Sequence, residues 1–249
     1  MKPYDLTDKR ILITGASSGI GRACAICAAE LGAHVVLTGR RANALEETRK
    51  CCRGDGHILI AGDITMPEFV GELAESSGKI DGLVHAAGVA PMFPVGILSA
   101  EHIDAVMRTN YYSFLELMKC YSKKKHRSDR LSVVAISSVS CEAGWAGGTV
   151  YCGSKGALSA SVRALAIELA NKGIRINAVC PSNIRTPLYE AGASDLNDEG
   201  SLSELLKKKQ PLGLGEPEQV AWPVCFLLSD AASFITGVNL PVDGGYLAQ

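Results

Sequence analysis

The sequence carries almost no net charge, with 25 lysines and arginines against 26 aspartates and glutamates in 249 residues. A chain without an excess of one sign has no overall field that would draw it to nucleic acid or to an anionic membrane. Two basic runs, Lys123–Arg127 and Lys207–Lys209, stand near the ends of expected helices. Such runs are typical of solvated surfaces or of partners for the helix dipole. We therefore expect no nucleic-acid partner and no membrane partner.

Long apolar runs are also lacking. The first ten residues are charged, and the run Ile11–Thr14 is too short for a signal-peptide core or a membrane span. With 47% hydrophobic and 20% charged residues, the chain still has enough apolar material for a full core. We expect a single domain over 1–249 and a cytoplasmic location.

Metal-ligand spacing is absent as well. The nine cysteines are scattered, and Cys24 and Cys27 stand one helical turn apart in an apolar segment. Because no second ligand pair stands at metal spacing and a reducing compartment disfavours disulfides, we expect this pair to pack in the core. The prediction is therefore no metal site.

Short apolar runs do alternate with longer amphipathic stretches, which is typical of βα units in a parallel sheet. Expected strands are Arg10–Thr14, Val35–Thr38, Ile58–Ala61, Leu83–Ala86, Val133–Ser137, Ile174–Val179 and Val238–Val242. Expected helices are Gly19–Leu31, Ala42–Cys52, about Ala100–Lys124 and Thr149–Ala170. This pattern predicts an α/β fold, a doubly wound parallel sheet of about seven strands with helices on both faces.

One segment, at about 187–215, departs from this alternation. It is rich in Gly, Ser, Asp and Lys and is too long for an ordinary connection. Insertions of this kind are usually mobile lids or active-site loops. We expect it to be a substrate lid.

A glycine-rich turn follows the first expected strand. In Thr14–Gly21, TGASSGIG, Gly15 permits a tight turn, Gly19 permits close approach of backbone N–H groups to a pyrophosphate, and Gly21 permits close helix packing. The helix N-terminus that opens here stabilises negative charge. Three glycines alone could equally form a loop without a ligand, so the prediction of a dinucleotide site depends on residues further along the chain.

The second expected strand ends without a carboxylate. An NAD site places Asp or Glu here to bind the ribose hydroxyls, whereas this chain has Arg40 and Arg41. A guanidinium can pair with a 2′-phosphate. We predict NADP(H), with Arg40 the stronger candidate and Arg41 the second; the alternative is that both begin an exposed helix.

Tyr151 and Lys155 stand four residues apart at the start of a long helix, so their side chains share one face. A phenol has an ordinary pKa of about 10 and needs a nearby positive charge to transfer protons at neutral pH. Ser138, at the end of the fifth strand, could hold a substrate oxygen beside the phenol. Asn110 could fix a water or backbone group that links Lys155 to solvent. The glycine turn follows the first strand, and Ser138, Tyr151 and Lys155 follow the fifth, at the edge where α/β sheets bind ligands.

Taken together, these motifs resemble the short-chain dehydrogenase/reductase family over essentially the whole chain. Asn110, Ser138, Tyr151 and Lys155 match its catalytic tetrad, and Arg175–Pro181, Thr186–Pro187 and Ile235–Gly237 match later segments. The resemblance implies a Rossmann-type fold, a dimer or tetramer, and cofactor contacts from Gly15, Ser17, Ser18, Gly19, Ile20, Gly21, Arg40, Arg41, Asp63, Ile64, Ala86, Ala87, Gly88, Tyr151, Lys155, Pro181, Ile184 and Thr186. Two positions depart from the family pattern, His85 in place of asparagine and Ser182 in place of glycine.

The resemblance implies hydride transfer between NADP(H) and a carbonyl or secondary alcohol. The pattern is similar to 3-oxoacyl-(acyl carrier protein) reductases, and also to steroid, sugar and small-alcohol dehydrogenases. Lys207–Lys209 could meet an acidic carrier, although a solvated helix end is the simpler interpretation. Cys141 and Cys152 flank Ser138 and Tyr151 and could react with thiol reagents, or be inert. Related epimerases and dehydratases have longer chains, and from another class the protein could be a catalytically silent NADP(H) sensor.

Overall fold

A computed structural model describes residues 4–193 and 208–248. Its strands are β1 (Arg10–Thr14), β2 (His34–Gly39), β3 (Ile58–Ala61), β4 (Ile80–His85), β5 (Arg127–Ile136), β6 (Ile174–Pro181) and β7 (Asn239–Val242). They form one parallel sheet in the order β3-β2-β1-β4-β5-β6-β7. The predicted fold class and the seven expected strands are confirmed.

The strands form because apolar residues run almost without interruption, as expected for a sheet covered on both faces. Leu12 of β1 lies in register between Val36 of β2 and Leu83 of β4, and all three side chains are buried. The expected bounds of β5 were wrong by six residues, since the strand begins at Arg127. Its first four residues are polar or charged, so the apolar pattern does not mark them.

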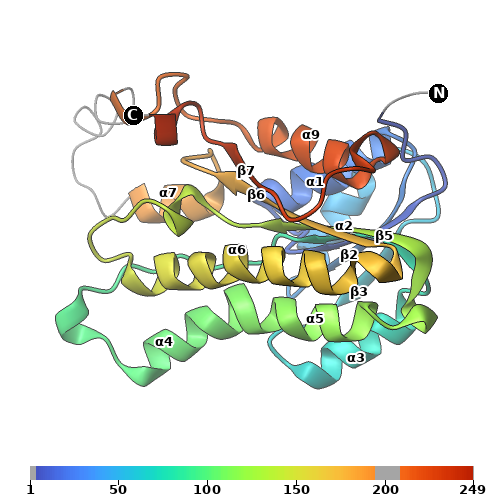
Figure 1. The fold of residues 1–249 in the computed structure, drawn as a ribbon, viewed down its shortest axis with the longest axis horizontal. Coiled ribbons are helices and arrows are strands. Elements are labelled where there is room, and N and C mark those ends of the chain that lie inside the picture. The colour runs from blue at the N-terminus through green and yellow to red at the C-terminus, as the bar shows by residue number, and fades with distance from the viewer. Residues whose placement is uncertain (1–3, 194–207, 249) are drawn as a thin grey trace.

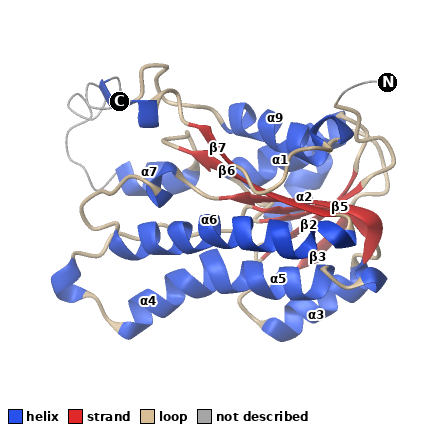
Figure 2. Ribbon diagram, in the orientation of Figure 1, coloured by secondary structure: helices blue, strands red, loops and turns tan. Residues whose placement is uncertain are grey.

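Helices cover both faces of the sheet (Figures 1 and 2). They are α1 (Gly19–Glu30), α2 (Ala42–Cys51), α3 (Pro67–Ser76), α4 (Ala100–Met107), α5 (Ser113–Tyr121), α6 (Thr149–Leu169), α7 (Pro187–Ala193) and α9 (Pro217–Leu228). One core cluster packs α1, α2 and α9 on one face, and a second packs α3, α5 and α6 on the other. Helices α3, α7 and α9 were not predicted, although each begins with proline, a signal for the first turn of a helix.

The expected helical stretch over about Ala100–Lys124 is confirmed over Ala100–Tyr121, but it is not a regular α-helix throughout. A π-helical turn, Arg108–Tyr112, separates α4 from α5. The Ser113 hydroxyl donates to the carbonyl oxygen of Thr109 at 2.7 Å, a side-chain bond that competes with the regular helical pattern. Turns of this kind are frequent at functional sites, and this one carries Asn110.

The sheet order reverses between β1 and β4, so the connections after these strands run in opposite directions. This switch point is where open α/β sheets bind ligands. Of the expected lid, the structure describes α7 and residues 208–215, while 194–207 lie outside the described residues, so a lid stays a prediction.

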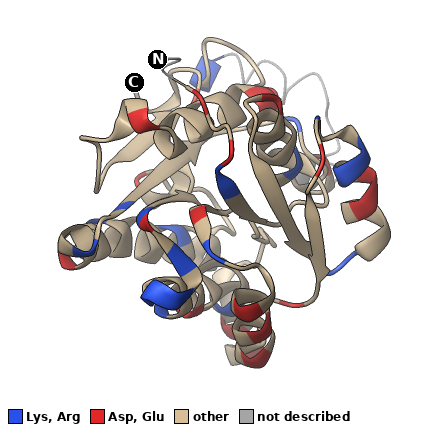
Figure 3. Ribbon diagram, turned by 90° about the vertical axis from the view of Figure 1, so that its right-hand side faces the viewer, with Lys and Arg blue, Asp and Glu red and all other residues tan. Residues whose placement is uncertain are grey.

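Charged residues of both signs are spread over the helices and the strand ends (Figure 3). In the basic run after α5, Lys125 pairs with Glu75 and His126 is buried, so only part of the run is a solvated surface. Among the described helices, none is long and apolar enough to cross a membrane.

Candidate active site

A cavity of about 780 Å³ opens at the carboxyl edge of the sheet, over the switch point. Every residue that the sequence assigned to cofactor binding lines it, and so does Ser138. Asn110 does not line the cavity and lies fully buried behind it. The structure therefore brings the glycine turn, the arginine pair and the Ser-Tyr-Lys group to one place.

The glycine turn has the shape of a phosphate cradle. Gly15 has a φ of +65°, and a Cβ there would lie 2.8 Å from the backbone nitrogen of Ala87. A Cβ on Gly21 would lie 2.4 Å from the carbonyl oxygen of Gly15. Helix α1 begins at Gly19 with no side-chain cap and no acidic residue in its first turn. Its backbone N–H groups thus remain available to an anion.

The arginine pair lies beside this turn. The Arg41 guanidinium donates 3.1 Å hydrogen bonds to the hydroxyls of Ser17 and Ser18, so it reaches across the mouth of the cradle. The Arg40 side chain is exposed and lines the same cavity. Asp63 lies further along the cavity and accepts hydrogen bonds from the backbone and side chain of Thr65. Arg41, the second candidate, is thus placed at least as well as Arg40 to contact a phosphate beside the glycine turn.

Lys155 is held at the centre of the site. Its ammonium group donates a 2.7 Å hydrogen bond to the carbonyl oxygen of Ile136 and lies 5.8 Å from the centroid of the Tyr151 ring. Burial lowers the pKa of Lys155 to about 8. The lysine therefore stays mostly charged at neutral pH while holding its proton weakly.

Tyr151 faces Ser138 across the cavity. Burial raises the pKa of the Tyr151 phenol to about 12, and its hydrogen bond with the Ser138 hydroxyl partly offsets this rise. The Ser138 oxygen also accepts the backbone N–H of Ser140 at 3.1 Å, which fixes its position at the end of β5. In this state the phenol is a poor acid, and an added positive charge beside it would be needed to make it effective.

Asn110 anchors the loop after β4. Its side chain accepts the backbone N–H of Val89 at 2.8 Å and donates to the carbonyl oxygen of Val89 at 2.9 Å. It also donates to the Ser154 hydroxyl, which in turn donates to the carbonyl oxygen of Tyr151. A Cβ on Gly88 would lie 3.4 Å from Asn110 Oδ1 and 3.6 Å from Lys155 Nζ. Asn110 thus supports the wall beside Lys155, and its predicted link from Lys155 to solvent stays a prediction.

His85, one of the two departures from the family pattern, is fully buried at the end of β4. The Thr14 hydroxyl accepts the backbone N–H groups of Ala86 and Ala87 and lies 3.3 Å from His85 Nδ1. Since that hydroxyl already accepts two donors, it donates its own proton to Nδ1, which assigns the imidazole proton to Nε2. Nε2 makes no hydrogen bond of normal geometry among the described residues, although the backbone of Asn110 lies near enough to favour the charged ring slightly. Burial lowers the pKa of His85 to about 3, so the ring is neutral.

Several cavity residues were not predicted from the sequence. They include Val89, Met92, Ser140, Trp145, Tyr189, Lys209 and Tyr246. Trp145 donates to the Ser140 hydroxyl at 3.2 Å and its ring lies 6.2 Å from that of Tyr151. Tyr189 lies in α7, Ser140 and Tyr246 lie in short 3₁₀ turns, and Val89, Met92 and Trp145 lie in loops, so no periodic pattern in the sequence marks them.

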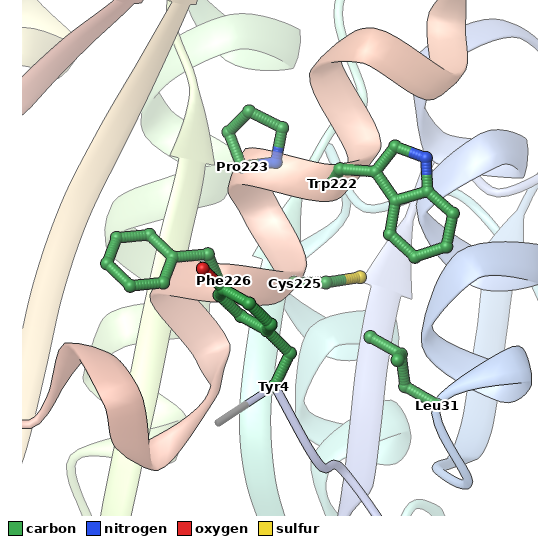
Figure 4. Close-up of a pocket in the computed structure, with 6 residues that line it drawn as sticks. All are labelled: Tyr4, Leu31, Trp222, Pro223, Cys225 and Phe226. Carbon is green, nitrogen blue, oxygen red and sulfur yellow. The ribbon is translucent and has the colours of Figure 1, made fainter. Parts of the chain in front are cut away.

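A second pocket, of about 350 Å³, lies away from this site between the start of the chain and α9 (Figure 4). It is lined by Tyr4, Leu31, Trp222, Pro223, Cys225 and Phe226, with the rings of Tyr4 and Phe226 edge to face at 5.8 Å. The lining contains no lysine, arginine, histidine, aspartate or glutamate, so the pocket is largely apolar. All nine cysteines are free, and Cys24 and Cys27 are buried in the core, as predicted.

Comparison with known proteins agrees with this arrangement. Residues 15–247 match the family model described as enoyl-(acyl carrier protein) reductase. The chain is 35% identical to an L-xylulose reductase of Caenorhabditis elegans, covering 98% of this chain and 97% of the relative. It is 34% identical to a 3-oxoacyl-(acyl-carrier-protein) reductase of Rickettsia conorii, covering 98% of each.

Solved structures agree as well. A short-chain type dehydrogenase/reductase from Mycobacterium marinum superposes with a TM-score of 0.89, is 31% identical, and is matched over 99% of this chain and 98% of its own. A protein from Beutenbergia cavernae, provisionally assigned as an NAD(P)-dependent gluconate 5-dehydrogenase with bound NADP, superposes with a TM-score of 0.90 at 30% identity over 99% of this chain and all of its own. The chain belongs to the short-chain dehydrogenase/reductase family, whose members are oxidoreductases acting on CH–OH and C=O groups.

Proposed function

We propose that this protein transfers a hydride between NADP(H) and a small carbonyl compound or secondary alcohol. The observation that carries the proposal is that Ser138, Tyr151 and Lys155 line the same cavity as the glycine turn and the arginine pair. A reacting carbonyl beside the phenol would then lie within the same chamber as a nucleotide seated on the turn. Proximity of this kind supplies a large part of the rate acceleration.

The chain's residues fit a dinucleotide phosphate. The uncapped start of α1 and the glycine cradle suit the pyrophosphate, and the guanidinium groups of Arg40 and Arg41 suit a 2′-phosphate that an acidic residue would repel. Asp63, Ile64 and the wall of Ala86 to Gly88 would hold the adenine side, and Pro181, Ile184 and Thr186 the nicotinamide side. The bound nucleotide would supply or accept the hydride.

The chain's own groups would manage the proton and the substrate oxygen. In reduction, Tyr151 donates its phenol proton to the carbonyl oxygen, while Ser138 donates a hydrogen bond that orients the same oxygen. Burial keeps the pKa of the phenol raised with Lys155 in place, and the positive charge of Lys155, together with that of a bound oxidised nicotinamide, would lower it. In oxidation the proton moves back to Tyr151.

Two substrate classes have support. Relatives that act on small sugars, such as the L-xylulose reductase, favour a small polyhydroxylated carbonyl compound. The Rickettsia relative favours a 3-oxoacyl thioester, at 34% identity over 244 residues against 35% over 247 for the L-xylulose reductase. The described cavity mixes polar Ser140 and Lys209 with aromatic Trp145 and Tyr246, which suits the small polar class better.

A panel of carbonyl compounds tests the proposal, with NADPH oxidation followed at saturating cofactor. Sugars, short ketones and a 3-oxoacyl thioester are compared for wild type and Tyr151→Phe. We expect turnover of at least one class by wild type, and none by Tyr151→Phe despite unchanged NADPH binding. NADPH binding without turnover of any class would instead favour a silent sensor.

We also propose that the protein forms a homo-oligomer, a dimer or a tetramer. Phe234 is fully exposed and Ile167, on α6, is 82% exposed. Large apolar side chains left in water in this way mark surfaces that associate. Light scattering of wild type and of Ile167→Asp and Phe234→Asp variants tests this, and a monomeric wild type would contradict it.

A further inference from the structure

The two ends of the cavity differ in the charges that they present. Its described lining residues include four cations, Arg40, Arg41, Lys155 and Lys209, and one carboxylate, Asp63. Arg40, Arg41 and Asp63 follow β2 and β3, at one end of the sheet order. Lys209 stands at the other end, beside the segments that follow β6 and β7.

The sheet order separates Lys209 from the cofactor phosphates. Neighbouring strands are about 4.8 Å apart, so β2 and β7 are separated by roughly 24 Å across five steps. Ser138, Tyr151 and Lys155 follow or contact β5, between these two ends. A nucleotide whose phosphates lie at the arginine end leaves Lys209 on the substrate side of the phenol.

Ser182, the second departure from the family pattern, fixes this end of the cavity. Its hydroxyl lies 2.8 Å from Oε1 of Gln210 and 2.9 Å from the carbonyl oxygen of Asp243. The Gln210 side chain is buried and also bonds both backbone groups of Asn183. The Ser182 hydroxyl thus contacts Gln210, the residue after Lys209, and Asp243, three residues before Tyr246.

Tyr246 is placed by the second of these segments. The Asp243 carboxylate accepts the backbone N–H groups of Gly245 and Leu247, which forms the turn that carries the tyrosine. The ammonium group of Lys209 lies 5.9 Å from the centroid of the Tyr246 ring, within the range of a cation–π contact. No carboxylate of the described residues lies within 4.0 Å of Lys209. Among the described residues, Lys209 is therefore a positioned cation of this cavity that no carboxylate neutralises.

We propose that Lys209, steadied by the Tyr246 ring, binds an anionic group of the substrate, a carboxylate or a phosphate ester. The substrates would then be anionic carbonyl compounds or the corresponding hydroxy acids and hydroxy phosphates. This inference rests on the proposed function and narrows its substrate class. A charge-assisted hydrogen bond from an ammonium group to such an oxygen is among the stronger contacts available to a ligand.

Binding to a protein that cannot turn over separates this inference from the proposed activity. The test uses isothermal titration calorimetry on Tyr151→Phe saturated with NADP+, with two matched pairs of probes. Acetoacetate is compared with its neutral isostere acetoacetamide, and dihydroxyacetone phosphate with dihydroxyacetone. The two pairs distinguish a carboxylate from a phosphate ester. Lys209→Met is then added, and Lys208→Met serves as the control, since Lys208 is also exposed but does not line the cavity.

We expect at least one anionic probe to bind more tightly than its neutral partner. Lys209→Met should weaken that probe about tenfold, equivalent to about 1.4 kcal/mol, and change the neutral partner by less than about twofold. Lys208→Met should change neither. Equal binding of both members of each pair, or equal losses in the two lysine variants, would overturn the inference. These outcomes do not depend on turnover, so a failure of the proposed activity is seen separately in the carbonyl panel.

Discussion

The ammonium group of Lys155 donates its hydrogen bond to the carbonyl oxygen of Ile136, the last residue of β5. The next residue, Ser137, returns a hydrogen bond of 3.2 Å from its hydroxyl to the carbonyl oxygen of Lys155. Helix α6 is therefore fastened to the strand that precedes Ser138. Because supporting hydrogen bonds fix the position of Lys155, we expect its side chain to move little when a ligand binds.

The arginine pair should set the cofactor preference. A charge-assisted hydrogen bond to a phosphate contributes about 1.5–3 kcal/mol, so Arg40→Ala and Arg41→Ala should each lower the NADPH-to-NADH ratio of kcat/KM by about tenfold or more. Arg49→Ala is the matched control, since Arg49 lies on α2 and pairs with Glu46 instead. If both single variants keep the wild-type ratio, the 2′-phosphate assignment fails.

Asn110 should act as a positioning residue. Asn110→Ala leaves both backbone groups of Val89 without their partner; this costs about 1–3 kcal/mol for a fully buried group and less for the half-buried Val89. We expect a lower free energy of unfolding and a kcat reduced more than the KM for cofactor. Asn110→Asp keeps an oxygen for the N–H of Val89 and should recover part of both losses. A purely structural role would give lower stability with normal kcat in the folded fraction.

His85 should make the fold sensitive to acid. Its pKa is about 3 in the folded protein, against an ordinary 6.5, so below pH 6.5 the unfolded chain takes up a proton that the folded chain refuses. His85 therefore does not change the free energy of unfolding above pH 6.5. As the pH falls below 6.5 it lowers that free energy, by about 2 kcal/mol at pH 5. Urea unfolding of wild type and His85→Asn between pH 7 and 5 measures this. We expect the free energy of unfolding to fall less steeply with pH in the variant, by the slope that corresponds to roughly one proton. Identical slopes for wild type and variant would contradict the prediction.

Those parts of the fold governed by local rules were predictable from the sequence. The bounds of β1 and β3 were predicted without error, because apolar runs and turn residues mark them. The glycine turn was predictable because its backbone excludes any Cβ at Gly15 and Gly21. Shared helical spacing likewise predicted that Tyr151 and Lys155 would face the same site.

Other parts depend on contacts between distant segments. The π turn at Asn110 follows from hydroxyl-to-backbone bonds that helical periodicity does not encode. The meeting of Lys209 with Tyr246 depends on Gln210 and Asp243, which Ser182 joins across the end of the sheet. Sequence patterns that repeat over a few residues carry no information about such pairings.

The central claim is that the positive charge of Lys155 makes the Tyr151 phenol acidic when the nucleotide is bound. NMR of 13Cζ-tyrosine measures the pKa of that phenol directly in the complex with NADP+, and Tyr151→Phe identifies its signal. We predict a Tyr151 pKa below the ordinary value of 10 in the complex, rising back toward about 12 without nucleotide and with Lys155→Met. A pKa that stays near 12 in the complex, or that Lys155→Met leaves unchanged, would contradict the account.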